Sequence, residues 1–76
     1  MIAFGHIKDT GDVYRINEVA QKLPYELYIS CGRDMYDAKS FVALFNLVGR
    51  DVTFVVEDWV DIKSFRKALR KMKMRP

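Results

Sequence analysis

Histidine and cysteine, two residue types that often act as nucleophiles near neutral pH, each occur once in this chain of 76 residues. His6 is the only imidazole and Cys31 the only thiol, while the carboxylates Asp9 and Asp12 stand three positions apart. Ser40 directly precedes an apolar run. An imidazole can accept a phosphoryl group when a cation beside it holds the incoming phosphate. We find no acidic cluster that would hold a metal ion, and we predict neither a metal nor a cofactor.

Length and composition are those of a small globular domain. Half of the residues are apolar and 30% are charged, far from the balance of disordered chains. We predict a single domain over residues 1–76, which buries only about 60% of its unfolded surface. We see no membrane-spanning run and no signal peptide. A lone cysteine excludes an internal disulfide, so we expect a reducing, cytoplasmic environment.

The elements that must position these side chains follow from the apolar periodicity. Ile2 and Phe4 alternate with smaller residues, which predicts a strand ending near Ile7. Thr10 or Asp12 can cap the helix that follows, by accepting a hydrogen bond from an orphan amide of its first turn. Pro24 ends this helix. Its apolar stripe comprises Ile16, Val19, Ala20 and Leu23.

The middle of the chain predicts a hairpin and a short helix. Residues 25–31 alternate as a half-buried strand, and residues 32–34 form the turn to a short partner strand at 35–37. Ser40 is a suitable N-cap for a helix over residues 41–48, with Gly49 as its C-terminal signal. In the strand predicted over residues 25–31, the side chains that face the core are Leu27, Ile29 and Cys31.

The remainder predicts one more strand and one more helix. The inward face of the last strand comprises Val52, Phe54 and Val56. Asp61 caps a third helix, whose inward residues are Ile62, Phe65, Leu69 and Met72. The order βαββαβα predicts an α+β fold, an open-faced β-sandwich with a four-stranded antiparallel sheet and three helices on one face.

This order, over about residues 2–72, resembles HPr, the histidine-containing phosphocarrier family of the bacterial sugar phosphotransferase system. Asp37-Ala38-Lys39-Ser40 and the apolar helix after it resemble the family's Ala-Lys-Ser segment. Val52-Thr53-Phe54 is similar to its last strand. The resemblance implies the HPr-like open-faced sandwich as the fold.

The resemblance also implies where an active site would lie, and there the chain departs from the family. Counting back from Ser40 without gaps, the family pattern His-Thr-Arg-Pro meets Asp9-Thr10-Gly11-Asp12. The acceptor imidazole becomes a carboxylate and the arginine becomes glycine. Two carboxylates repel a dianionic phosphoryl group, so we interpret Asp9, Thr10, Gly11 and Asp12 as a degenerate active-site loop whose acids cap the helix. We therefore expect no enzymatic activity and no catalytic residue.

Two other residues bear on phosphate chemistry. His6 lies three residues before the lost histidine and could act as a displaced acceptor, but we favour a partly exposed histidine at the end of the first strand. The serine that matches Ser40 is phosphorylated by a regulatory kinase in the family, so the resemblance implies a regulatory phosphorylation site there. The alternative is an ordinary N-cap, worth about 1 kcal/mol against alanine.

The second helix is apolar almost all round, and a helix of two turns cannot bury every side. We expect Leu44 and Leu47 to face the core and Phe41, Val42 or Phe45 to be exposed in part. Exposed apolar patches often mark partner surfaces. The matching helix is also where HPr proteins bind their partners, so we predict a protein partner here. The alternative is burial of the patch in a homodimer.

The end of the chain is basic, although the net charge is only +3. The basic residues are Lys63, Arg66, Lys67, Arg70, Lys71, Lys73 and Arg75. We favour a solvated helix face over a nucleic-acid site, because no aromatic residue interleaves the cations and no loop pairs with them to form a groove.

Three functions are thus to be compared. The first is an HPr-like regulatory or protein-binding domain without phosphotransfer. The second is an active phosphocarrier with an unorthodox acceptor, for which Arg15 is the only nearby cation. The third is a small nucleic-acid-binding domain that acts through the basic C-terminal helix. We favour them in this order.

Overall fold

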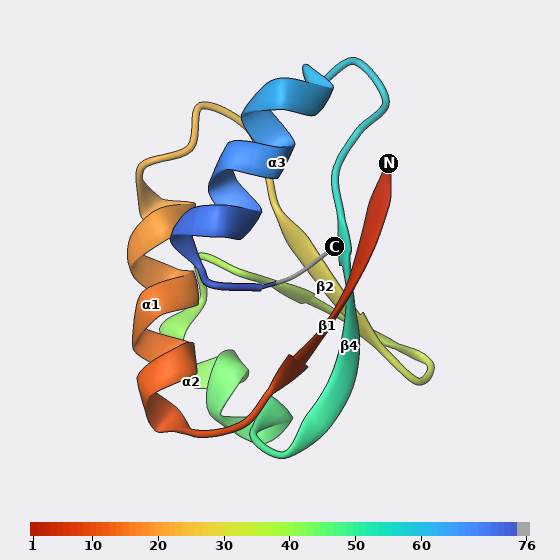
Figure 1. The fold of residues 1–76 in the computed structure, drawn as a ribbon. Helices are drawn as coiled ribbons and strands as arrows, with labels where there is room; N and C mark the ends of the chain where they lie inside the picture. Colours follow the sequence, from red (N-terminus) through yellow and green to blue (C-terminus); the bar gives the residue numbers. More distant parts are fainter. Residues whose placement is uncertain (75–76) are drawn as a thin grey trace.

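Three helices lie on one face of a four-stranded antiparallel sheet in the computed structural model, which describes residues 1–74 (Figure 1). This arrangement confirms the predicted α+β open-faced sandwich and the order βαββαβα. The elements are β1 (Ile2–Ile7), α1 (Thr10–Gln21), β2 (Tyr28–Cys31), β3 (Asp34–Asp37), α2 (Phe41–Leu44), the 3-10 helix η1 (Phe45–Leu47), β4 (Arg50–Val55) and α3 (Ile62–Lys71).

The sheet order is β1-β4-β2-β3, so the last strand in sequence lies between β1 and β2. Val52 and Phe54 of β4, together with Val56 just after it, are buried beneath the helices, as the alternation predicts. Phe54 has no exposed surface and its ring reaches the backbone of β1. A Cβ built on Gly5 would lie 2.7 Å from Phe54 Cε2. The side chain of Phe54 therefore fills the space that a larger residue at position 5 would need.

The other face of the sheet is open to solvent, and it is less polar than the alternation predicts. Phe4, Thr53, Ser30 and Met35 form one row across the four strands. Both apolar members of this row are well exposed, Phe4 at 68% and Met35 at 59%. An antiparallel sheet tolerates such a solvated face because its other face supplies the core.

The apolar stripes of the two long helices pack against the sheet. Ile16 and Ala20 of α1 are fully buried, as predicted, and Val13 joins them one turn earlier. In α3, Phe65 and Leu69 are buried. The prediction for Ile62 was wrong: its side chain is 48% exposed, because the first residue of the helix lies at the edge of the buried face.

Two predicted boundaries of the hairpin were wrong. The strand predicted over residues 25–31 begins only at Tyr28, although Tyr25 and Leu27 are buried as a strand would bury them. The turn has two residues, and Asp34 already pairs with Cys31. Gly32 at the first turn position has φ +61°, a backbone conformation that suits glycine, as in type II′ turns.

The helix predicted over residues 41–48 was also too long. It is one turn of α-helix followed by the 3-10 helix η1. Leu44 and Leu47 are both fully buried, and residues three apart eclipse one another in a 3-10 helix. The tighter winding therefore turns both leucines toward the core. Gly49, with φ +83°, then turns the chain into β4 as predicted.

Within residues 1–74, none of the helices has both the length and the apolar character needed to cross a bilayer.

Candidate functional site

Two aspartates, Asp9 and Asp12, accept hydrogen bonds that hold the loop between β1 and α1 and the first turn of α1. Asp9, not Thr10 or Asp12 as predicted, is the N-cap of α1, and its Oδ1 accepts a hydrogen bond from the Asp12 amide at 3.0 Å. Asp9 takes this place because its extended backbone, with φ −158°, directs the side chain toward the first-turn amides. The prediction that the acids of this loop cap the helix is therefore confirmed for Asp9 and not for Asp12, whose carboxylate accepts bonds from Lys8 and Arg15.

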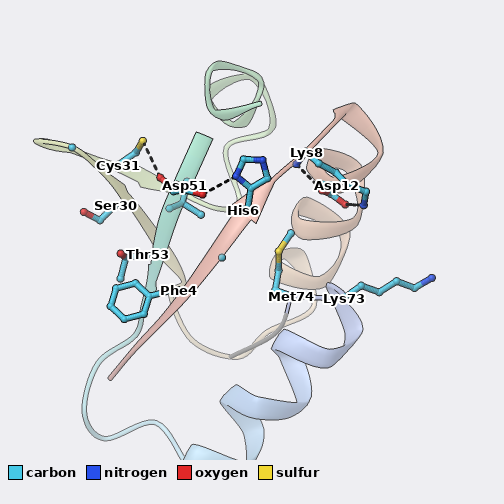
Figure 2. A pocket seen from close by; sticks show the side chains of 13 residues that line it. Phe4, His6, Lys8, Asp12, Ser30, Cys31, Asp51, Thr53, Lys73 and Met74 are labelled. Atoms are coloured by element: carbon cyan, nitrogen blue, oxygen red, sulfur yellow. Dashed lines mark hydrogen bonds and ion pairs between the residues drawn. The ribbon is translucent and has the colours of Figure 1, made fainter. Parts of the chain in front are cut away.

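Asp12 is buried, with only 3% of its surface exposed, and three donors converge on its carboxylate. Oδ2 accepts the backbone amide of Lys8 at 2.9 Å. Oδ1 accepts the Lys8 ammonium at 3.2 Å and Nη1 of Arg15 at 2.7 Å. Figure 2 shows the bond that ties this carboxylate to the end of β1. Asp12 thus joins the strand to the helix.

These bonds set the charge of the loop. Burial by itself raises the pKa of the Asp12 carboxyl, but the hydrogen bonds from the Lys8 amide, the Lys8 ammonium and the Arg15 guanidinium outweigh it. The pKa of Asp12 is therefore lowered from its ordinary value of 3.8. The carboxylate stays ionised and neutralises the cations on either side of the loop. Arg15 does turn toward the loop, but it is bound by Asp12.

His6 lies near the end of β1 on the open face, half exposed, as predicted. Its Nδ1 is 2.8 Å from Oδ1 of Asp51 on β4. Both line a surface hollow of about 910 Å³ that also reaches Lys8, Asp12 and Lys73. Lys8 is bound to Asp12, and the Lys73 side chain extends away from His6 (Figure 2). No cation among residues 1–74 lies within hydrogen-bond distance of the ring.

Cys31 lies in the wall of the same hollow. Its thiol is buried and donates to the backbone oxygen of Asp51 at 3.5 Å. Ser30 and Thr53 also line this hollow, and their hydroxyls lie on the open face of the sheet (Figure 2). No metal-holding group of three His, Cys, Asp or Glu side chains occurs within residues 1–74. The hollow therefore holds one exposed His–Asp pair, and the nearby Cys31 thiol bonds to the backbone of Asp51 and not to the His6 ring.

Ser40 occupies the N-cap of α2, as predicted, but its side chain makes no capping hydrogen bond. Its backbone amide donates to Asp37 O at 2.9 Å, and the neighbouring Lys39 amide donates to Oδ1 of Asp37. Asp37 thus satisfies the amides of this turn. The Ser40 hydroxyl is exposed and unused within the part of the chain described.

The two caps should therefore differ in energy. Asp9→Ala removes the bond to the Asp12 amide and should lower the free energy of unfolding by about 1 kcal/mol. Ser40→Ala removes no capping bond and should change it by less than about 0.5 kcal/mol. Urea denaturation of both variants beside the wild type measures the difference. Equal costs for the two alanines would contradict this assignment.

Four side chains from α1, α2 and η1 form an exposed apolar surface, called here the aromatic patch: Tyr14, Phe41, Val42 and Phe45. The ring of Phe41 lies 4.9 Å from each of the Tyr14 and Phe45 rings, centroid to centroid. Val42 is the most exposed of the four at 79%. The expectation that Leu44 and Leu47 are buried while Phe41, Val42 or Phe45 is exposed in part is confirmed. Tyr14 was missed, although an aromatic residue outside the apolar stripe of α1 was a usable signal.

Hydrogen bonds from α1 fix the position of this patch. Nδ2 of Asn17 donates to the backbone oxygens of Ala38 and Lys39, both at 3.2 Å. Nε2 of Gln21 donates to the same Lys39 oxygen at 2.8 Å. Ala38 is fully buried and its amide donates to Leu27 O. The segment before α2 is thus held against α1, and this places the rings of Phe41 and Phe45 next to Tyr14 of α1.

Compared with known proteins, the chain matches no family model and no curated protein sequence. Membership of the HPr family therefore stays a prediction. The candidate site has two parts. At the start of α1, the charges of Lys8 and Arg15 are paired with Asp12, and the aromatic patch lies at the surface of α1, α2 and η1.

Proposed function

We propose that the chain is an HPr-like, phosphotransferase-system-related domain that has no enzymatic activity and binds another protein in the cytoplasm. The aromatic patch of Tyr14, Phe41, Val42 and Phe45 is the binding surface. The single observation that carries the proposal is that three aromatic rings, one each from α1, α2 and η1, are packed together at the surface while Val42 of α2 is exposed. Contiguous exposed apolar surface of this kind marks interaction sites on small proteins.

The energetics of protein interfaces favour this surface. Aromatic side chains dominate the binding free energy at interface centres, where a few residues each contribute about 2 kcal/mol or more. The patch is already ordered, because Asn17 and Gln21 hold the segment before α2. Binding therefore requires little further ordering of the chain, which reduces the entropic cost of association.

Charge at the start of α1 supports the absence of phosphotransfer. A phosphocarrier needs a nucleophilic ring and a free cation for the arriving dianion. Here Asp12 binds both Lys8 and Arg15, and Asp9 already occupies the first-turn amide. His6 faces Asp51. An active phosphocarrier is the weaker proposal for these reasons.

Ser40 is the proposed position of regulation. Its hydroxyl is exposed and directly precedes Phe41 of the patch. A phosphate there would add about two negative charges at the edge of the apolar surface, and this would change the partner's affinity.

Incubation with phosphoenolpyruvate and the first enzyme of the phosphotransferase system tests the catalytic half of the proposal. We expect no acid-labile phosphate on the chain, because no described cation is free beside His6 or Asp9. The measurement is intact-mass spectrometry at neutral pH, with a genuine HPr as the positive control. Labelling at His6 would overturn the proposal and favour the unorthodox phosphocarrier.

Affinity capture from a lysate tests the binding half. Val42→Asp should reduce the captured partner by at least about 30-fold, because a charge replaces the most exposed side chain of the aromatic patch. Met35→Asp is the matched control, since it places the same charge on an exposed apolar residue of the open sheet face. Phe41→Asp should act like Val42→Asp.

Loss of the partner with Met35→Asp as well, or retention with Val42→Asp, would contradict the assignment of the surface. Sedimentation of the wild type distinguishes the homodimer alternative. If the chain self-associates and Val42→Asp makes it monomeric, the partner is a second copy.

A further inference from the structure

Helix α3 presents an exposed face made only of cations. After Ile62, each exposed residue of the helix is basic: Lys63, Arg66, Lys67, Arg70 and Lys71, called here the α3 basic face. Steps of three and four residues place them on one side of the helix. At 1.5 Å per residue they extend over about 12 Å. The apolar residues of α3 point the other way, into the core.

In the part of the chain that the structure describes, these cations have no acidic partners. Within residues 1–74, no carboxylate lies within ion-pair distance of any residue of the α3 basic face. Elsewhere in the molecule Lys8, Arg15, Lys22 and Lys39 each pair with an acid. The helix dipole favours only the cations of the last turn, so it accounts for Arg70 and Lys71 and not for Lys63. The charge of this face is therefore not explained by the stability of the helix.

Two cations of α1, Arg15 and Lys22, lie near the end of the α3 basic face, although each pairs with an acid, Asp12 and Glu18 respectively. A second hollow, of about 540 Å³, lies where Lys71 of α3 meets Arg15 and Lys22 of α1. Glu18 is the acid in this hollow and lies 3.8 Å from Lys22. Lys71 therefore links the α3 basic face to a depression between the two helices, which supplies the groove that the sequence did not reveal.

We propose that the α3 basic face binds the phosphate backbone of double-helical nucleic acid. This face consists of other residues than the aromatic patch, although Tyr14 of the patch also lines the second hollow. The proposal goes beyond the proposed protein binding. Arginine and lysine side chains on a rigid element neutralise phosphates and release counterions, which provides affinity without any base contact. A face without aromatic residues suits a duplex, because single-strand sites add rings on which bases stack. The lack of interleaved aromatics therefore argues against single strands only.

Other polyanions fit this face less well. The centres of protein interfaces are depleted of charged residues. Between these five cations the helix exposes no apolar side chain, because Phe65, Ala68 and Leu69 are buried. An anionic membrane is usually bound by basic residues together with an inserted apolar group. Two exposed apolar residues lie at the start of α3: Trp59 shortly before the helix and Ile62 as its first residue. The exposed acids Glu57, Asp58 and Asp61 are their neighbours in sequence. An anionic membrane would repel those acids.

Salt dependence of duplex binding tests the proposal. Fluorescence anisotropy with a labelled DNA duplex of about 20 base pairs gives the dissociation constant from about 50 to 200 mM salt. If all five cations contact phosphates, the slope of log K against log salt is about −4.5 and the affinity falls roughly 500-fold over this range. Anisotropy that does not change at the lowest salt would overturn the proposal.

Two double variants with the same net charge locate the site. Arg66→Gln with Arg70→Gln should reduce the slope by about two and weaken binding at low salt about tenfold or more. Arg33→Gln with Arg50→Gln removes the same charge from the hairpin and the start of β4, and should weaken binding less than threefold. Arg66→Lys with Arg70→Lys keeps the charge and should retain the wild-type slope, which guards against an effect on folding.

Equal losses in the two glutamine variants would overturn the site and indicate attraction to net charge alone. Phosphatidylserine vesicles and polyglutamate serve as competing probes at the same salt. Tighter binding to either of them than to the duplex would overturn nucleic acid as the ligand. Unchanged capture of the protein partner by the Arg66→Gln, Arg70→Gln variant would show that the two surfaces are independent.

Discussion

Asp12→Asn is expected to lower the free energy of unfolding by about 3 kcal/mol. The side chain is buried and its carboxylate accepts bonds from the Lys8 amide, the Lys8 ammonium and the Arg15 guanidinium. Asparagine keeps one acceptor oxygen, places an amide NH2 where an oxygen accepted, and removes the charge that both cations face. A domain of this size has roughly 4–11 kcal/mol of stability, so the loss is a large fraction.

The effect should depend on pH in a defined direction. Because the pKa of Asp12 is lower in the folded chain than its ordinary value of 3.8, the unfolded chain binds the proton more readily. The stabilisation from Asp12 is therefore fully present above that ordinary value and is lost as pH falls through the lowered folded pKa. The difference between wild type and Asp12→Asn should stay constant from about pH 5 to 7 and shrink below about pH 4.

Urea denaturation followed by circular dichroism at several pH values measures this difference. Asp34→Asn is the matched control, because Asp34 is exposed in the hairpin and the same change there should cost less than about 0.5 kcal/mol. Similar costs for the two asparagines, or a difference that grows as pH falls, would contradict the role given to Asp12.

The fold was predictable because its signals are local and repeated. The stripe Ile16, Ala20 in α1 and the alternation Val52, Phe54 in β4 each assign one face to the core, and one antiparallel sheet covered by helices satisfies them all. Boundaries were harder. Leu44 and Leu47 fit an α-helix as well as a 3-10 turn in the sequence, so the apolar pattern alone does not predict η1.

The site was predictable in kind but not in detail. The residue types predicted that an acid would cap α1, but the choice of Asp9 depends on its backbone angles. The three hydrogen bonds that Asp12 accepts depend on the path of the chain between β1 and α1. Tyr14 joins Phe41 and Phe45 across 27 or more positions of sequence, a contact that no local pattern encodes. Likewise, the lack of ion pairs on the α3 basic face within residues 1–74 depends on where the acidic side chains lie in the folded chain.

Phe54→Ala is expected to have the largest effect on stability, about 3–5 kcal/mol. Phe54 is the largest of the fully buried side chains and lies on β4, between β1 and β2. Its removal leaves a cavity beneath the helices at the centre of the sheet. In a domain with marginal stability, a substantial fraction of the variant should be unfolded at 37 °C, which thermal denaturation measures directly. A cost below about 1.5 kcal/mol would mean that the core closes over the cavity.

Gly5 tests the same contact from the opposite side. Gly5→Ala should cost about 1–3 kcal/mol in the wild type, because the new Cβ would meet the buried Phe54 ring at 2.7 Å. In a Phe54→Leu background the sign should reverse, since leucine has no atom equivalent to Cε2 and alanine is favoured over glycine in a strand by roughly 0.5–1 kcal/mol. A double-mutant cycle measured by urea denaturation gives the coupling free energy. Costs that add within about 0.5 kcal/mol would show that the cost of Gly5→Ala arises from the β1 backbone and not from Phe54.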